Sequence, residues 1–316
     1  MPQNFLTFVI PQKFKGERLD RVLDELVPDR SRAWLQKLAR RGGIRIQGNP
    51  VRRSNIRVQG GERLALEVDA NTSKQAANSA AELEILFEDE HLIAINKPPG
   101  LLTHAAPQTD EAALADLLVE RFGPLPTQRG AERPGIVHRL DRETSGVIVA
   151  ARDSRTMDGL SDQFRAREVQ KLYLALVHGT PAEPNFDIDL PLEPQRGAGD
   201  REQIAPLGKG KSAETQFRLE ASFGQFSLLA CMPRTGRRHQ IRVHAAEAGF
   251  PVMFDKLYRR PDRAELPAGA PLLRRHALHA SEIRLTHPIT AENLHFKAPP
   301  PADFAALLDW LEQQRP

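Results

Sequence analysis

Residues 133–152, RPGIVHRLDRETSGVIVAAR, lead from a turn into a strand. The run DRETSG contains the turn formers Asp, Thr, Ser and Gly, and GVIVAA has the pattern of a fully buried strand. Asp141 is therefore expected on a loop that exposes its side chain, next to a strand that fixes its position. His138, Arg139 and Arg142 are neighbouring cations that would favour its ionised form. On this stretch alone, an Asp that merely caps backbone amides in a turn is the simpler interpretation.

Two other functional classes are excluded by spacing. HRLD is not the protein-kinase HRD motif, because no DFG and no glycine-rich phosphate loop follow at suitable positions. The histidines do not predict a metal site either, and no metal is expected. The chain has no HExxH, it has the single cysteine Cys231, and the pair His276 and His279 lacks a third partner.

Length and composition describe a cytosolic protein of two domains. A chain of 316 residues is too long for one small core. One cysteine excludes a disulfide framework and fits a reducing cytoplasm. No signal peptide or membrane-spanning run is recognisable, so no membrane partner is expected. The net charge of +3 is a mild bias whose meaning depends on its distribution.

Residues 16–68 are expected to form the first domain. Apolar residues from Leu19 to Leu26 recur at helical spacing, and Pro28 ends that pattern. Ser31 is a suitable N-cap for a second helix, SRAWLQKLARR, which Gly42 and Gly43 end. Strand-like pieces, IRIQG and ERLALEV, follow after it.

The charge of this domain has one sign over a long segment. From Arg30 to Arg57 there are nine Lys or Arg residues and no Asp or Glu. A solvated face usually mixes signs, so this segment predicts a polyanionic partner, with a merely soluble basic helix as the alternative. The candidate RNA-binding residues here are Arg32, Lys37, Arg40, Arg41 and Arg45.

Residues 69–81 read as a flexible linker, and residues 82–316 as the second domain. Strands are expected at 83–89, 91–97, 146–152, 171–179, 213–222 and 226–233, with further sheet pieces at 251–258, 276–285 and 293–299. Helices are expected at 111–122, 154–167 and 299–314, with an exposed hairpin or loop at 192–212. The chain is therefore assigned to the α+β class, with a mixed, mainly antiparallel β-sheet and flanking helices.

The segment RTGRRHQIRVHAAEAG, residues 234–249, combines an apolar face with many cations. Gly236 precedes the expected helix. Such a helix is poorly suited to a core but well suited to presenting guanidinium groups to an anion. Tyr173, in contrast, alternates with apolar residues in its strand and by itself would be a core residue.

Several motifs together resemble one known family. KPPG at 97–100, HRLDRETSG at 138–146, KLYLALVHG at 171–179, TGRRHQIRVH at 235–244 and LHA at 278–280 occur in the order found in RluA-type pseudouridine synthases. Members often carry an N-terminal S4 RNA-binding module, which residues 16–68 resemble. The segment FDKLY at 254–258 and the chain length are similar to the RluC-type enzymes of large-subunit ribosomal RNA.

The resemblance implies isomerisation of uridine to pseudouridine in RNA, without a cofactor, by a monomeric enzyme whose partner is large-subunit ribosomal RNA. Asp141 matches the catalytic aspartate, acting as a nucleophile or through a glycal route. Tyr173 matches the tyrosine that stacks on the target base and is a candidate base, and Arg242 the arginine that pairs with the aspartate. Arg139 matches the residue that fills the gap left by the flipped uridine. The remaining assignments are His138, Leu140 and Leu278 in the pocket, and Arg237 and Arg238 at the RNA.

Two rival functions remain open from the sequence. One is a ribosome-assembly or RNA-binding factor without activity, although such a protein has no need to combine Asp141, Tyr173 and Arg242. The other is a hydrolase that uses Asp141 as a base on a phosphate ester, which would require a divalent metal ion.

Overall fold

The computed structural model describes residues 4–27, 35, 38–40, 42–68, 83–104, 112–128, 130, 132–196, 202–206, 210–258 and 266–315. The chain divides into two compact units. The first comprises residues 1–83, 102–137 and 150–157, and the second comprises residues 84–101, 138–149 and 158–316. The predicted linker, residues 69–81, lies outside the described residues, and the predicted domain boundaries stay a prediction.

The first unit contains a four-stranded antiparallel sheet in the order β1-β4-β2-β3. Its strands are β1 (Asn4–Val9), β2 (Ile44–Ile46), β3 (Asn49–Val51) and β4 (Arg63–Val68). A short 3-10 helix η1 (Gln12–Phe14) and the predicted helix α1 (Leu19–Leu26) lie between β1 and β2. The strand β1, which precedes the expected start of the domain at residue 16, pairs with β4 along its whole length.

Apolar residues of these elements form one core. Leu19 and Leu23 of α1 pack in a buried cluster with Ile44 of β2 and Leu64 of β4. The second predicted helix is described only at residues 35 and 38–40, which are helical. The first unit also holds α4 (Leu114–Phe122), which begins three residues later than the start expected at 111.

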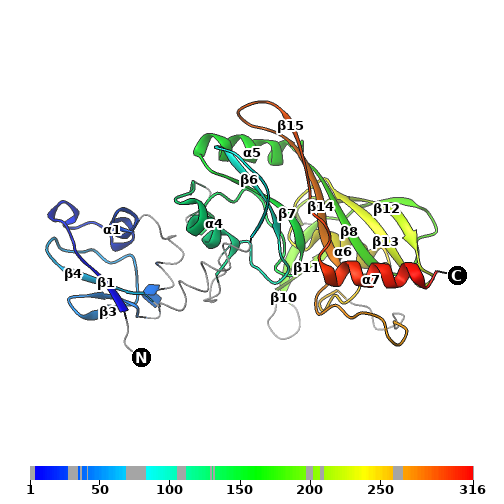
Figure 1. Ribbon diagram of the computed structural model, residues 1–316, viewed down its shortest axis with the longest axis horizontal. Helices are drawn as coiled ribbons and strands as arrows, with labels where there is room; N and C mark the ends of the chain where they lie inside the picture. Colours follow the sequence, from blue (N-terminus) through cyan, green and yellow to red (C-terminus); the bar gives the residue numbers. More distant parts are fainter. Residues whose placement is uncertain are drawn as a thin grey trace. The chain divides into compact units, whose positions relative to one another are not determined.

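The second unit is built on a nine-stranded mixed sheet, drawn in Figure 1. The strand order is β5-β6-β7-β14-β8-β13-β12-β9, and β15 pairs with β14. β7 runs parallel to β14, while β8 is antiparallel to both β14 and β13. The expected mixed, largely antiparallel sheet is thus confirmed. Its strands are β5 (Glu84–Glu88), β6 (Leu92–Lys97), β7 (Ser145–Ala151), β8 (Gln170–His178), β9 (Asn185–Asp189), β12 (Glu214–Ser222), β13 (Phe226–Pro233), β14 (Leu278–Thr286) and β15 (Asn293–Lys297).

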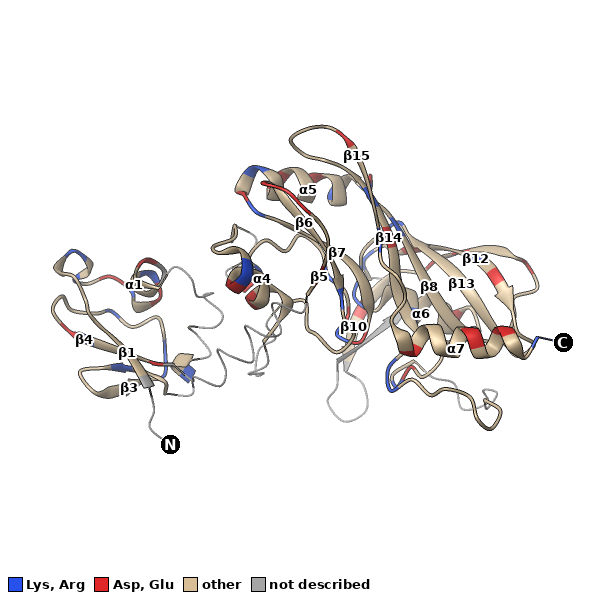
Figure 2. Cartoon of the chain, viewed as in Figure 1, with Lys and Arg blue, Asp and Glu red and all other residues tan. Residues whose placement is uncertain are grey.

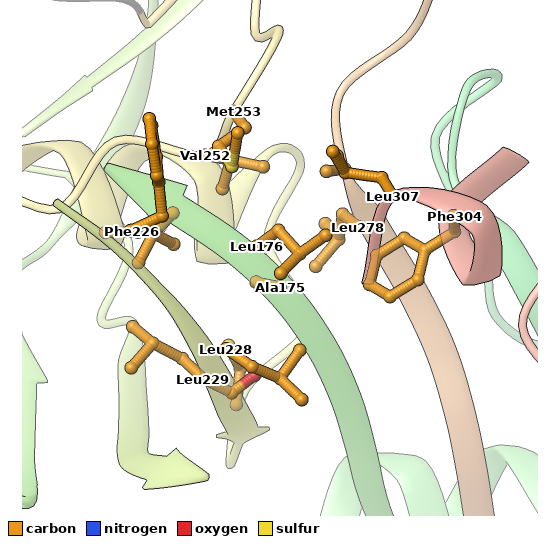
Figure 3. Packing of buried hydrophobic residues seen from close by; sticks show 14 of the residues in the cluster. Ala175, Leu176, Phe226, Leu228, Leu229, Val252, Met253, Leu278, Phe304 and Leu307 are labelled. Carbon is orange, nitrogen blue, oxygen red and sulfur yellow. The ribbon is translucent and has the colours of Figure 1, made fainter. Parts of the chain in front are cut away.

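The remaining elements are three helices and a hairpin. They are α5 (Ser154–Ala166), α6 (Gln240–Glu247), α7 (Ala302–Gln313), and the hairpin of β10 (Leu192–Arg196) with β11 (Glu202–Pro206). Figure 3 shows the main core, in which Leu176 of β8 and Leu229 of β13 pack with Leu278 of β14. Phe304 and Leu307 of α7 complete that core, as expected of an amphipathic helix covering the sheet.

Three local expectations are corrected. The residue that caps α5 is Asp153, whose carboxylate accepts a hydrogen bond from the Thr156 amide at 2.8 Å, whereas Ser154 was expected in that role. α6 begins only at Gln240, so most cations of the segment 234–249 precede it. Residues 251–258 are not a strand; they form turns with one isolated bridge between Val252 and Val177. No helix among the described residues has the length and apolarity needed to cross a membrane.

Candidate active site

Asp141 lies on the loop that enters β7, as the sequence predicts, and two histidine side chains, one just before β14 and one at its start, hold that loop. The Thr144 amide donates to the Asp141 carbonyl at 3.0 Å. The Thr144 hydroxyl contacts His276 Nε2 at 2.8 Å, and the Ser145 hydroxyl contacts His279 Nδ1 at 3.0 Å. The two histidines that were rejected as a metal pair therefore brace the loop of Asp141.

Gly146 lets this loop approach β14 closely. Its φ is +117°, and a Cβ built there would lie 2.0 Å from the Ala280 carbonyl oxygen and 2.7 Å from the Ala280 nitrogen. Both atoms belong to the backbone of β14, which cannot move away without disrupting the sheet. A residue without a side chain is therefore needed where the catalytic loop joins β7.

The KPPG turn at residues 97–100 is joined to the same loop. Lys97 is fully buried, and its ammonium group donates to the carbonyl oxygens of Pro98 and Leu101 at 2.9 Å each and of Arg142 at 3.2 Å. The Gly100 amide also donates to the Arg142 carbonyl, at 2.9 Å. The turn thus reverses the chain, as the simplest interpretation expected, and its lysine fixes the residue that follows Asp141.

Arg242 of α6 joins two carboxylates. Its Nη1 donates to Asp141 Oδ2 at 3.0 Å, and its Nε and Nη2 donate to Asp255 Oδ2 and Oδ1 at 2.6 and 2.9 Å. The exposed fraction of the side chain is 5% for Arg242, 0% for Asp255 and 16% for Asp141. The anions that Arg242 binds are therefore two aspartates, and of these two only Asp141 is reached by solvent.

The charge of Arg242 keeps Asp141 ionised. Burial raises the pKa of Asp141, but His239, Arg242 and His276 together lower it below its usual value. Burial lowers the pKa of His239 to about 4 and that of His276 to about 3, so both rings are neutral at pH 7. Arg242, whose own pKa is raised by Asp255 and Asp141 against the effect of burial, is therefore the cation that acts at neutral pH.

His239 and Tyr258 also contact this group of charged residues. His239 Nε2 lies 3.8 Å from Asp141 Oδ2, and its Nδ1 lies 2.7 Å from the Tyr258 hydroxyl. The guanidinium carbon of Arg242 is 5.0 Å from the centre of the Tyr258 ring. An anion opposite Nε2 favours a proton on that nitrogen, so Nδ1 accepts from the Tyr258 hydroxyl.

Tyr173 lies in the middle of β8, opposite Cys231 of β13 and Ala280 of β14. Its side chain is half-buried against the main core. Burial raises the pKa of its phenol well above the usual value, and the Asp141 carboxylate and Cys231 raise it further. The phenol is therefore protonated at pH 7, and its polar end lies close enough to Asp141 to sense that charge.

The predicted pocket residues are placed in different ways. Arg139 is exposed, whereas Leu140 and Leu278 are buried, and Leu278 belongs to the main core. His138 stacks on Phe164 with ring centres 4.7 Å apart, and its Nε2 accepts a hydrogen bond from the Val149 amide at 2.9 Å. Burial lowers its pKa to about 3, so the expectation that His138 is a cation supporting Asp141 is wrong. The pocket assignments themselves stay predictions.

Some of the predicted RNA-binding residues are described. Arg40 is exposed, and Arg45 of β2 is half-buried with its guanidinium 4.9 Å from the centre of the Phe5 ring. Arg32, Lys37 and Arg41 lie outside the described residues. Arg237 and Arg238 are exposed on the segment before α6. Figure 2 shows that the first unit also has acidic positions, on α1 and β4, outside the segment between Arg30 and Arg57.

The sequence interpretation missed Asp255, His239 and His276 as parts of this site. His239 lies inside TGRRHQIRVH, where the pattern marks it only as one of many cations. Asp255 lies inside FDKLY, and an isolated Asp in a turn has no local pattern that marks a partner thirteen residues away. Among the described residues, no group of three or more His, Cys, Asp or Glu side chains is arranged to hold a metal ion.

Comparisons with known proteins identify the family to which the chain is similar. Residues 91–247 match the family model described as RNA pseudouridylate synthase. An uncharacterised RNA pseudouridine synthase of Synechocystis is 36% identical over 95% of this chain and 91% of its own length. The ribosomal large subunit pseudouridine synthase D of Xanthomonas campestris is 35% identical over 96% of this chain and 92% of its own. The solved structure of human RNA pseudouridylate synthase domain containing 4 superposes with a TM-score of 0.59 at 27% identity, covering 76% of this chain and 98% of that one.

Proposed function

The chain belongs to the RNA pseudouridylate synthase family, and we propose that the uridines it isomerises lie in large-subunit ribosomal RNA. Conversion of uridine to pseudouridine in RNA is the activity of this family. Support for the ribosomal target comes from relatives such as that of Xanthomonas campestris, whose name states the large subunit and whose similarity covers nearly the whole chain. This relative is named synthase D, whereas FDKLY and the chain length are similar to the RluC-type enzymes, so the assignment to the RluC type stays a prediction.

The observation that carries the proposed mechanism is the ion pair between the buried Arg242 and Asp141, whose side chain is still 16% exposed. In the reaction the bond between N1 and C1′ breaks, the bond between C5 and C1′ forms, C5 loses a proton and N1 gains one. Asp141 is available as a carboxylate without a general base, because Arg242 keeps its pKa low. It acts at C1′ as a nucleophile or by the glycal route.

The target nucleotide must leave its stack before Asp141 can reach the sugar, which costs roughly a few kcal/mol. Arg139, exposed two residues before Asp141, is suited to fill the vacated space and offset part of that cost. Tyr173 then offers an aromatic face to the uracil ring. Since its pKa is raised by burial, we assign Tyr173 to stacking in its neutral form and not to proton removal.

The first unit is proposed to bind RNA in the manner of an S4 module. Support comes from the one-sign segment between Arg30 and Arg57 and from the small sheet that packs with α1 around one core. Exposed Arg40 provides a phosphate contact there, and exposed Arg237 and Arg238 provide contacts beside Asp141. A ribosomal substrate also places the protein in the cytoplasm, where we propose that it works as a monomer.

The test is to map pseudouridine in ribosomal RNA from cells with and without the gene, and to restore either the natural chain or Asp141→Asn. Loss of specific large-subunit pseudouridines that only the natural chain restores is the expected result. Loss in transfer RNA alone would contradict the ribosomal target. Restoration by Asp141→Asn would contradict the site, and unchanged pseudouridine everywhere would support the alternative of an inactive RNA-binding factor, which no comparison favours.

A further inference from the structure

Arg242 has three nitrogens that each make a contact in a fixed plane, and only one of them faces Asp141. The other two are bound by Asp255, at 2.6 and 2.9 Å. A guanidinium is a rigid fork, so fixing two of its nitrogens fixes the direction of the third. The position of Nη1 against Asp141 Oδ2, at 3.0 Å, is therefore set by Asp255.

Asp255 is itself held in place. Its Oδ1 accepts hydrogen bonds from the amides of Leu257 at 2.8 Å and Tyr258 at 3.1 Å, and the residue is fully buried. The preceding residue, Phe254, has a φ of +60°, a left-handed conformation that costs energy for a side chain with a Cβ. This turn places the Asp255 carboxylate against Arg242 of α6.

We propose that Asp255 is a positioning residue for the isomerisation, which orients Arg242 so that its Nη1 stays bonded to the Asp141 carboxylate during the reaction. Asp255 is fully buried and acts through Arg242. The other titratable groups around Asp141 are His239 before α6, His276 before β14, Lys97 at the end of β6 and Tyr173 of β8. This inference rests on the proposed role of Asp141.

The sharpest variant is Asp255→Asn, because it changes one atom. The amide oxygen can keep the contacts of Oδ1 with Leu257, Tyr258 and Arg242 Nη2, so the turn remains bonded. The amide nitrogen then replaces Oδ2 and sets a donor against the donor Nε of Arg242. The guanidinium of Arg242 loses its hydrogen bond from Nε and the negative charge of its partner, while the amides of Leu257 and Tyr258 keep their hydrogen bonds to the side chain of residue 255.

The measurements are tritium release from RNA labelled at C5 of uridine, in single turnovers with saturating enzyme between about pH 4.5 and pH 8, together with RNA binding and thermal melting. The expected rate is about 100-fold lower, the loss that misplacing a catalytic group typically causes. RNA affinity should stay within about twofold, since Asp255 is buried. The acid limb of the rate should move to higher pH, because burial then outweighs the weakened effect of Arg242 on Asp141.

A control is Glu220→Gln, which removes the ion pair of Arg218 with Glu220, 2.7 Å long and exposed on β12. It should keep the natural rate and acid limb. Asp255→Glu, which keeps the charge but displaces it by one methylene, should lower the rate less than Asp255→Asn and covers the case in which the latter fails to fold. A natural rate in Asp255→Asn, or a slow rate with an unmoved acid limb, would overturn the inference. Full activity in Asp141→Asn would instead refute the proposed role of Asp141.

Discussion

Replacing Arg242 by Met should strongly destabilise the protein at neutral pH. The guanidinium is 5% exposed and lies between Asp255, which is fully buried, and Asp141, which is 16% exposed. Removing it leaves two carboxylates with little solvent to compensate them, which typically costs about 3–5 kcal/mol. For a domain of this size the melting temperature should fall by roughly 6–20 °C.

The pH dependence of this loss has a defined sign. In the natural protein the pKa values of Asp141 and Asp255 are lowered, so their contribution to stability is present above the unfolded pKa and disappears as the pH falls. In Arg242→Met the effect of burial on the carboxyl groups is no longer opposed by Arg242. The pKa of Asp255, which is fully buried, then rises above its unfolded value. That group then takes up a proton as the pH falls, which relieves the destabilisation. The difference in unfolding free energy between the two proteins should be largest near pH 7 and narrow toward pH 5.

Urea unfolding followed by circular dichroism at several pH values measures this difference. Arg242→Met combined with Asp255→Asn should recover part of the stability, because no unpaired charge then remains fully buried. Arg218→Met is the comparison, since Arg218 is 51% exposed and its partner Glu220 33%, so water can replace the lost cation; we expect a loss of at most about 1 kcal/mol. A loss below about 1 kcal/mol for Arg242→Met, or a difference that widens in acid, would refute the argument.

Three further predictions concern the base, the RNA and the backbone. Tyr173→Phe should keep RNA affinity in a filter-binding assay, whereas Tyr173→Ala should weaken it by about 1–3 kcal/mol, because the ring that stacks on the target base is lost. If the Phe and Ala variants bound RNA equally well, the stacking role would be contradicted. Neutralising Arg40, Arg41 and Arg45 should weaken RNA binding and flatten its salt dependence by up to about 0.9 in slope for each lost phosphate contact. The same change should leave the single-turnover rate at saturating enzyme intact, and a slower chemical step would argue against this division. Gly146→Ala should destabilise the protein by at least about 2 kcal/mol in a thermal melt, because its Cβ would meet the Ala280 backbone at φ +117°; an unchanged melting temperature would show that β7 and β14 can separate.

The sequence was sufficient wherever a residue's role depends on its neighbours along the chain. The alternation in KLYLALVHG and the apolar run GVIVAA predicted β8 and β7, and the turn residues of DRETSG placed Asp141 on a loop. Those elements bury one or both faces, so their hydrophobic pattern follows from the requirement to form a core. The motifs around Asp141 and Arg242 similarly predicted an ion pair that the structure contains.

Tertiary structure decided which charges meet. His138 was expected to be a cation beside Asp141, yet its ring is buried on Phe164 and neutral, while Asp255, which no local pattern marked, binds Arg242 through two oxygens. The physical reason is that hydrophobic periodicity is a short-range property of the chain, whereas the pKa of a carboxylate depends on burial and on charges within a few ångströms, whatever their separation in sequence. The sequence alone thus determined that an aspartate, a tyrosine and an arginine are present in a pseudouridine synthase framework. Folding of the turn at 254–258 against α6 determined how that arginine is held.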